Sequence, residues 1–158
     1  MAKLLAKKIK NSTKLVQKNW EEPKLDDWLR ELKKAIQKID SPTILVAHSL
    51  AVSLVMHWTS ANNNPHIIGA LLVAPADVDS PEHTPDVTRN FSPMPIRKLP
   101  FPSIVVCSEN DPFIDIKKQI ILPKMGKRAY KYWTKRTCKF QFKLRILGRR
   151  TIDFTAIN

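Results

Sequence analysis

The sequence predicts an α/β fold, a parallel β-sheet with helices on both faces. Three segments are apolar throughout, without the polar alternation of a half-exposed strand, which is typical of strands covered on both faces. Enough chain separates them for crossover connections, and a helical pattern lies between the first two. At 158 residues the chain is long enough to bury one sizeable core. The predicted strands are TILVA (residues 43–47), IIGALLVAP (67–75) and SIVVCSE (103–109).

Two elements precede the first of these strands. The apolar run TKLVQ, residues 13–17, predicts a short strand, and the loop NWEEP follows it and ends at Pro23. An amphipathic helix is predicted from Leu25, because apolar residues recur every three or four positions along one stripe. Pro42 ends this helix, since proline disfavours helical geometry in the residue before it. The stripe consists of Leu25, Trp28, Leu29, Leu32, Ile36 and Ile39.

A second helix is predicted from Leu50 to Ser60, and the polar run ANNNP ends it. Between the second and third strands, residues 77–102 contain six prolines and little periodicity. We expect this segment to form a long ordered loop over one end of the sheet. Loops of this kind often border a site.

The positive charge of the chain is concentrated in its last quarter. Residues 1–116 hold 14 Lys and Arg against 13 Asp and Glu, whereas residues 117–158 hold 13 against the single acid Asp153. The net charge of +13 therefore favours a nucleic-acid partner only for the end of the chain. We expect two parts, residues 1–116 and a basic tail of residues 117–158.

Composition argues against several other classes of protein. No apolar stretch approaches the roughly 18 residues of a membrane span, and lysines interrupt the start, MAKLLAKKIK, so we expect a cytoplasmic protein without a membrane partner. Cys107 and Cys138 match no metal-ligand spacing and make a poor disulfide framework. With three glycines, the chain has no glycine-rich phosphate loop. No metal or organic cofactor is expected.

Ser49 lies where the first strand meets the second helix, between His48 and Leu50. A tight strand-to-helix turn of this kind, the nucleophile elbow, lifts a serine hydroxyl clear of the sheet. Small residues flank such a serine, and Ala47 and Ala51 stand where glycine is usual. The Leu50 backbone N–H, at the helix N-terminus, is a natural oxyanion donor. The alternative is that Ser49 only caps the helix.

Asp111 follows the third predicted strand. Open α/β sheets place their sites at the carboxyl edge, so an acid at this position is suited to orienting a histidine. The chain order of serine before aspartate also fits an α/β-hydrolase. The alternative is that Asp111 starts a turn or caps a following helix.

Four segments together resemble the small serine hydrolases related to retinoblastoma-binding protein 9 and their bacterial YdeN-like relatives. The segments occur in order and at the family's spacing, and the resemblance covers residues 3–118. It implies that residues 1–116 form an α/β-hydrolase-like domain, which hydrolyses ester or related acyl bonds with a Ser-Asp-His triad. By motif, Ser49 matches the nucleophile and Asp111 the triad acid. The segments are WEEPKLDDWL (20–29), VAHSL (46–50), GALLVAPAD (69–77) and LPFPSIVVCSENDPF (99–113).

Besides Ala51 in place of the usual glycine, two features depart from the family pattern. The family's first apolar strand and its glycine-bearing oxyanion loop would precede this chain, so the sheet is expected to lack its first strand. The family's histidine lies near the C-terminus, but no histidine follows His83. We expect the His48 side chain to diverge from Ser49, and His57 lies about 12 Å of helix rise farther on. His66 and His83 fall in predicted loops, and His83 is the best remaining substitute, so weak or absent activity is expected.

The basic tail, residues 117–158, resembles no part of that family, and two explanations stay open. Its cations alternate with aromatic side chains suited to stacking on bases, which favours a non-catalytic binding protein for nucleic acid. A change of reading frame in the gene would also end the resemblance and the acidic residues together. Within the tail, KFQFKLRI alternates as an edge strand does. The aromatic residues are Tyr130, Tyr132, Trp133, Phe140 and Phe142.

Overall fold

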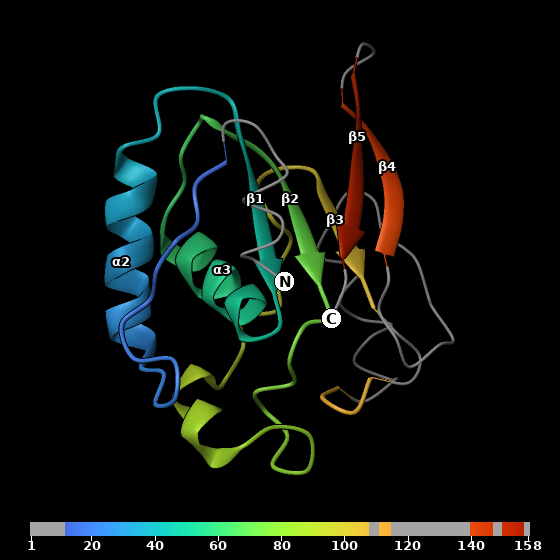
Figure 1. Ribbon diagram of the computed structural model, residues 1–158. Coiled ribbons are helices and arrows are strands. Elements are labelled where there is room, and N and C mark those ends of the chain that lie inside the picture. Colours follow the sequence, from blue (N-terminus) through green and yellow to red (C-terminus); the bar gives the residue numbers. More distant parts are fainter. Residues whose placement is uncertain (1–11, 108–110, 115–139, 147–149, 157–158) are drawn as a thin grey trace. The chain divides into compact units, whose positions relative to one another are not determined.

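A computed structural model of the chain describes residues 12–107, 111–114, 140–146 and 150–156 (Figure 1). The chain divides into two compact units, Leu15–Thr134 and a second one made of Met1–Lys14 and Lys135–Asn158. The boundary expected at residue 116 lies outside the described residues, and it stays a prediction.

The larger unit contains the predicted parallel sheet, with strand order β1-β2-β3. Strand β1 spans Thr43–His48, β2 spans Ile67–Val73 and β3 spans Ser103–Val106. His48 pairs with Val73, and Val73 pairs with Val106, so the three strands end level with one another. In open α/β sheets, this carboxyl edge is where sites are built. The α/β class predicted from the three apolar segments is confirmed.

Helix α2, Leu25–Gln37, follows the predicted amphipathic pattern. Its buried residues Trp28, Leu32 and Ile36 are spaced by four, so they lie on one face. Lys24, at its N-cap position, makes no side-chain hydrogen bond to the helix. The Leu25 N–H, which has no acceptor within the helix, instead donates to Asn90 Oδ1 at 2.7 Å, across 65 residues of sequence.

Helix α3, Leu50–Ala61, packs on β1, and α2 packs on α3 (Figure 1). Most of α3 is buried, because its apolar residues lie on all sides of the helix rather than along one stripe. The core of the unit is formed by this helix, the inner residues of the strands and side chains of the proline-rich segment. Its least exposed hydrophobic members include Val52, Met56, Leu72, Val78 and Phe91.

The segment 77–102 is ordered, as expected, but it is not a plain loop. It contains the 3₁₀ helix η1, Asp86–Phe91, whose Phe91 is fully buried and lies edge-to-face against Trp28, with ring centroids 5.5 Å apart. The third predicted strand was extended too far, since β3 ends at Val106. Its predicted last residues, 108 and 109, lie outside the described part of the chain.

The strand predicted at residues 13–17 is wrong, because this segment is irregular in the structure. It runs beside α2 rather than beside a strand: Gln17 Nε2 donates to the Trp28 carbonyl at 3.5 Å, and Trp28 Nε1 donates to the Lys18 carbonyl at 3.2 Å. An apolar run becomes a strand only where a neighbouring strand offers ladder hydrogen bonds.

The smaller unit contains one antiparallel hairpin. Strand β4 spans Phe140–Ile146 and β5 spans Arg150–Ala156, in a register that runs from Phe140↔Ala156 to Ile146↔Arg150. The alternating pattern of KFQFKLRI thus correctly predicted a strand. Within the described ranges, no helix is long and apolar enough to cross a membrane.

Candidate functional site

Ser49 is the single residue between the end of β1 and the start of α3. Its backbone has φ 55° and ψ −124°, a conformation that is strained for any residue except glycine. The Ser49 N–H donates to the Val73 carbonyl at 3.0 Å, and the Ser49 carbonyl accepts from the Val52 N–H at 2.9 Å. The sheet and the helix therefore both hold this turn, as the nucleophile-elbow pattern predicted.

The Ser49 hydroxyl does not cap helix α3. Ser49 occupies the N-cap position of α3, but its side chain makes no capping hydrogen bond. A serine that only capped the helix would direct its oxygen to the N–H groups of the first turn. Because the residue is also half-exposed, the capping alternative leaves its position and its strain unexplained.

The start of α3 offers a hydrogen-bond donor next to that hydroxyl. Leu50 is the first helical residue, and its N–H has no acceptor in the part of the chain that the structure describes. Such N–H groups carry the positive end of the helix dipole. Ala47 is buried and Ala51 packs against the core, so methyl groups fit where glycine is usual.

Asp111 lies in the turn after β3, and it is half-exposed. Its Oδ1 accepts a hydrogen bond from the Phe113 N–H at 3.0 Å, so it does stabilise a turn, as the alternative reading expected. Its charge also reaches the ends of two strands. Burial raises the pKa of the Cys107 thiol to about 11, and the Asp111 carboxylate adds to this increase.

The same carboxylate acts on the residue before Ser49. Desolvation lowers the pKa of His48, while the negative charge of Asp111 opposes that decrease. Ser49 directly follows β1 and Asp111 comes after β3, and these parallel strands end at the same carboxyl edge of the sheet. The two residues that the sequence singled out, 62 positions apart along the chain, therefore both follow strands that end at this edge.

Two of the histidines are placed away from this edge or are occupied. The His57 Nε2 lies 2.7 Å from the Phe91 carbonyl, which fixes its ring against η1. His66 directly precedes β2, so it lies at the opposite, amino-terminal edge of the sheet. Neither is placed to serve Ser49.

His83 lies against the turn that contains Asp111. Its Nδ1 is 3.1 Å from the Pro112 carbonyl, and because a carbonyl can only accept, Nδ1 must carry the proton. In the neutral ring, Nε2 then keeps a lone pair that can accept a proton. No sequence signal connects residues 83 and 112, because an ordered loop alone brings them together.

The described residues contain no cluster of three or more His, Cys, Asp or Glu that could hold a metal ion. The described thiol, Cys107, is free and buried. The groups that the described residues offer for chemistry near Ser49 are its hydroxyl, the Leu50 backbone N–H, the Asp111 carboxylate and the His83 imidazole.

Comparisons with known proteins give a fold and a family for the chain. A solved structure of a YdeN-like hydrolase from Pectobacterium atrosepticum is similar at 22% identity with a TM-score of 0.59, a likeness of fold. The match covers 73% of this chain and 58% of that one, so the chain spans less than two thirds of its structural relative. No curated protein matches the chain significantly. The family model for serine hydrolases matches residues 2–128, and the chain therefore belongs to the serine hydrolase family.

Proposed function

We propose that this chain provides a nucleophilic serine for hydrolysis of a small ester or related acyl substrate. The observation that carries the proposal is the strained turn at Ser49, whose φ of 55° costs free energy that a capping role does not require. Membership of the serine hydrolase family supports the same chemistry.

In the proposed reaction, the Ser49 hydroxyl oxygen attacks the acyl carbon and its proton passes to a base. The Leu50 N–H stabilises the negative charge that develops on the acyl oxygen. The alcohol or amine then leaves with a proton, and water hydrolyses the acyl-enzyme in a second step. Asp111 orients the imidazole that accepts the proton and stabilises its charged form.

The base is the weak part of this scheme. A serine hydroxyl without a base is a poor nucleophile at neutral pH. His83 is the described imidazole hydrogen-bonded to the turn of Asp111, but its partner is the Pro112 carbonyl rather than the carboxylate. A neutral carbonyl stabilises an imidazolium less than a carboxylate does, so we propose slow turnover.

A fluorophosphonate probe tests the nucleophile directly. We expect slow labelling of the native chain, loss of labelling in Ser49→Ala, and faster labelling when free imidazole is added to supply the base. Ser60→Ala is the matched control: Ser60 lies on α3, the helix that follows Ser49, and its hydroxyl donates to the Met56 carbonyl at 3.0 Å. Labelling that persists in Ser49→Ala, or that is absent with and without imidazole, would contradict the proposal.

The second candidate is a non-catalytic protein that binds nucleic acid through residues 117–158. The 13 cations and single acid of this segment support it. RNA binding that weakens with salt and disappears on truncation after Asp115 would favour this function. A change of reading frame would remove its basis, and translating the gene's other two frames tests that: a Gly-His motif in one of them would indicate such a change.

A further inference from the structure

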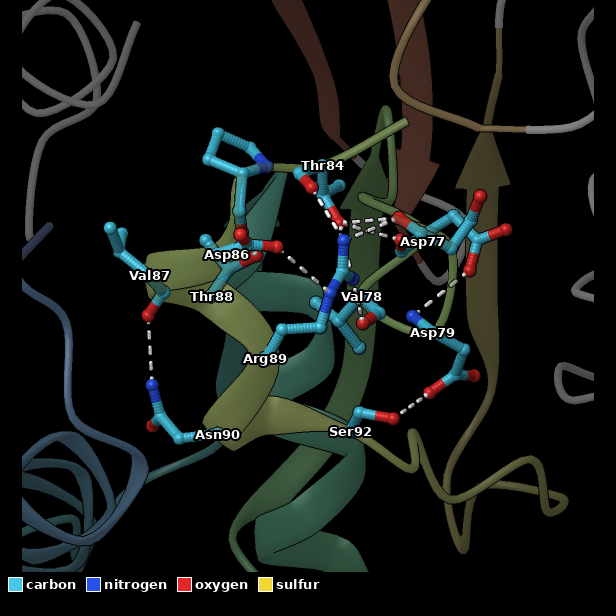
Figure 2. Close-up of polar contacts among 12 residues, drawn as sticks. Asp77, Val78, Asp79, Thr84, Asp86, Val87, Thr88, Arg89, Asn90 and Ser92 are labelled. Atoms are coloured by element: carbon cyan, nitrogen blue, oxygen red, sulfur yellow. Dashed lines mark hydrogen bonds and ion pairs between the residues drawn. The ribbon is translucent and has the colours of Figure 1, made fainter. Parts of the chain in front are cut away.

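Arg89 closes the proline-rich segment on itself. From η1, its guanidinium donates four hydrogen bonds: to the carbonyls of Val78 (2.6 Å), Ser80 (2.8 Å) and Thr84 (2.6 Å), and to Thr84 Oγ1 (3.0 Å) (Figure 2). Only the planar fork of arginine can satisfy acceptors so arranged. The ion pair with Asp86, at 3.8 Å, contributes little because that carboxylate is 95% exposed.

The loop that Arg89 closes also holds the turn of Asp111, at two points. The Asp77 N–H donates to the Phe113 carbonyl at 2.8 Å, and His83 Nδ1 donates to the Pro112 carbonyl at 3.1 Å. Thr84 ties the first point to Arg89, since its hydroxyl donates to the Asp77 carbonyl at 2.8 Å. Asp77 and Thr84 are buried, so water competes little for their contacts, whereas the His83 contact is exposed.

The segment that follows Arg89 in the chain packs into the core of the unit. The next residue, Asn90, donates to the Pro23 carbonyl at 2.9 Å, and Phe91 is fully buried. The Phe91 carbonyl accepts from His57 of α3, the helix that begins directly after Ser49. Figure 2 also shows the next residue, Ser92, whose hydroxyl donates a hydrogen bond to Asp79 Oδ1 at 2.7 Å. Arg89 therefore connects the helix of the nucleophile turn to the loop that holds the acid's turn.

We infer that Arg89 is a positioning residue, which fixes the turn of Asp111 relative to the Ser49 end of the sheet. It acts through hydrogen bonds to the loop and touches no reacting group. Its catalytic meaning rests on the proposed function of Ser49 and Asp111, but its structural effect on the Asp111 carboxylate does not.

The ring of His48 reports where the Asp111 carboxylate lies. Burial lowers the pKa of His48, and the Asp111 carboxylate opposes this decrease. An NMR pH titration that follows the ring resonances of His48 would measure this pKa in each variant. In Asp111→Asn we expect the pKa of His48 to fall. In Arg89→Lys, which keeps the charge but loses the fork, we expect roughly half of that fall or more, because the displaced carboxylate no longer supports the imidazolium.

Three further variants distinguish a specific effect on the position of the Asp111 carboxylate from a general loss of structure. Arg97→Lys is the matched control, since Arg97 is exposed and donates once, to the Ser60 carbonyl at 3.2 Å, and it should leave the pKa of His48 unchanged. In the Asp111→Asn background, Arg89→Lys should cause no further fall. Thr84→Val, which removes one acceptor of Arg89, should cause a smaller fall in the same direction and serves if Arg89→Lys does not fold.

The direction of the change distinguishes the outcomes. Unfolding would raise the pKa of His48 toward its ordinary value of 6.5, because desolvation is lost. A folded Arg89→Lys with an unchanged pKa, or a fall that persists in the Asp111→Asn background, would overturn the inference. Failure of the fluorophosphonate test would instead remove the proposed chemistry and leave this titration intact.

Discussion

The turns that carry Ser49 and Asp111 lie at one edge of the sheet but are held by different forces. The Ser49 turn is fixed by its two neighbours in the chain, β1 and α3, and by a ladder bond to Val73. The Asp111 turn is held by polar contacts from a loop that precedes it in the chain, at Asp77 and His83. The apolar core thus determines where the nucleophile lies, whereas a polar loop determines where the acid lies. The two should therefore respond differently to substitution.

The largest expected effect removes the support of both turns. Leu72, 1% exposed on the central strand, pairs with Ala47 of β1 and Val105 of β3. Leu72→Ala should lower the free energy of unfolding by about 2–5 kcal/mol, because it leaves a cavity in the core. Urea unfolding measures this. Ile68→Ala, at a 38% exposed site on the same strand, is the control, and an equal loss there would contradict a core centred on Leu72.

A smaller effect should be confined to the loop. Asp79 Oδ1 accepts from the Ser92 hydroxyl at 2.7 Å and from the Met94 N–H at 3.0 Å. Asp79→Ala should cost roughly 2–3 kcal/mol of unfolding free energy, because two charge-assisted hydrogen bonds are lost. The Asp86 side chain is 95% exposed, so Asp86→Ala should cause no measurable change in the free energy of unfolding. If the two variants behave alike in urea, the loop is not held by Asp79.

Cys107, the residue directly after β3, gives a test that depends on pH. Burial, with a contribution from Asp111, raises the pKa of its thiol from 9.0 to about 11. The folded state therefore holds this proton more tightly, and the stabilisation present below pH 9.0 should be lost as the pH rises toward 11, by about 2 kcal/mol.

Comparison of urea midpoints at pH 8 and pH 11 measures this loss for Cys107. Subtracting the profile of Cys107→Ala removes the contribution of other titrating groups. Asp111→Asn should make the loss smaller, because one cause of the raised pKa is gone. An unchanged loss would indicate that the carboxylate is not held near this thiol.

The sequence predicts the Ser49 turn better than it predicts the contacts that hold the Asp111 turn. The apolar runs and the four-residue spacing in α2 are local patterns, and they predicted the strands, the helices and the Ser49 junction. The misplaced strand at residues 13–17 shows the limit of such patterns, since pairing depends on a neighbour that the run itself does not specify.

The contacts that hold Asp111 have no local pattern. Asn90 and His83 use their side chains on backbone groups of other segments, 67 and 29 residues away, and Arg89 uses its side chain on carbonyls of its own loop. Nearly any sequence offers carbonyls for such bonds, so the partner segment carries no signature. Family motif and chain order identified Asp111, but only the folded loop shows what holds it in place.

The smallest effect separates the two turns most directly. Ser49 has a positive φ, so Ser49→Gly should raise the unfolding free energy by about 1 kcal/mol relative to Ser49→Ala, because relief of strain outweighs the added freedom of the unfolded chain. Asp111 is not among the described residues with positive φ, and Asp111→Gly should lower stability, because the Phe113 N–H loses its acceptor. Urea unfolding of the three variants measures both signs. If glycine destabilised both turns, the backbone at Ser49 would not be strained, and the main support for its role as a nucleophile would be lost.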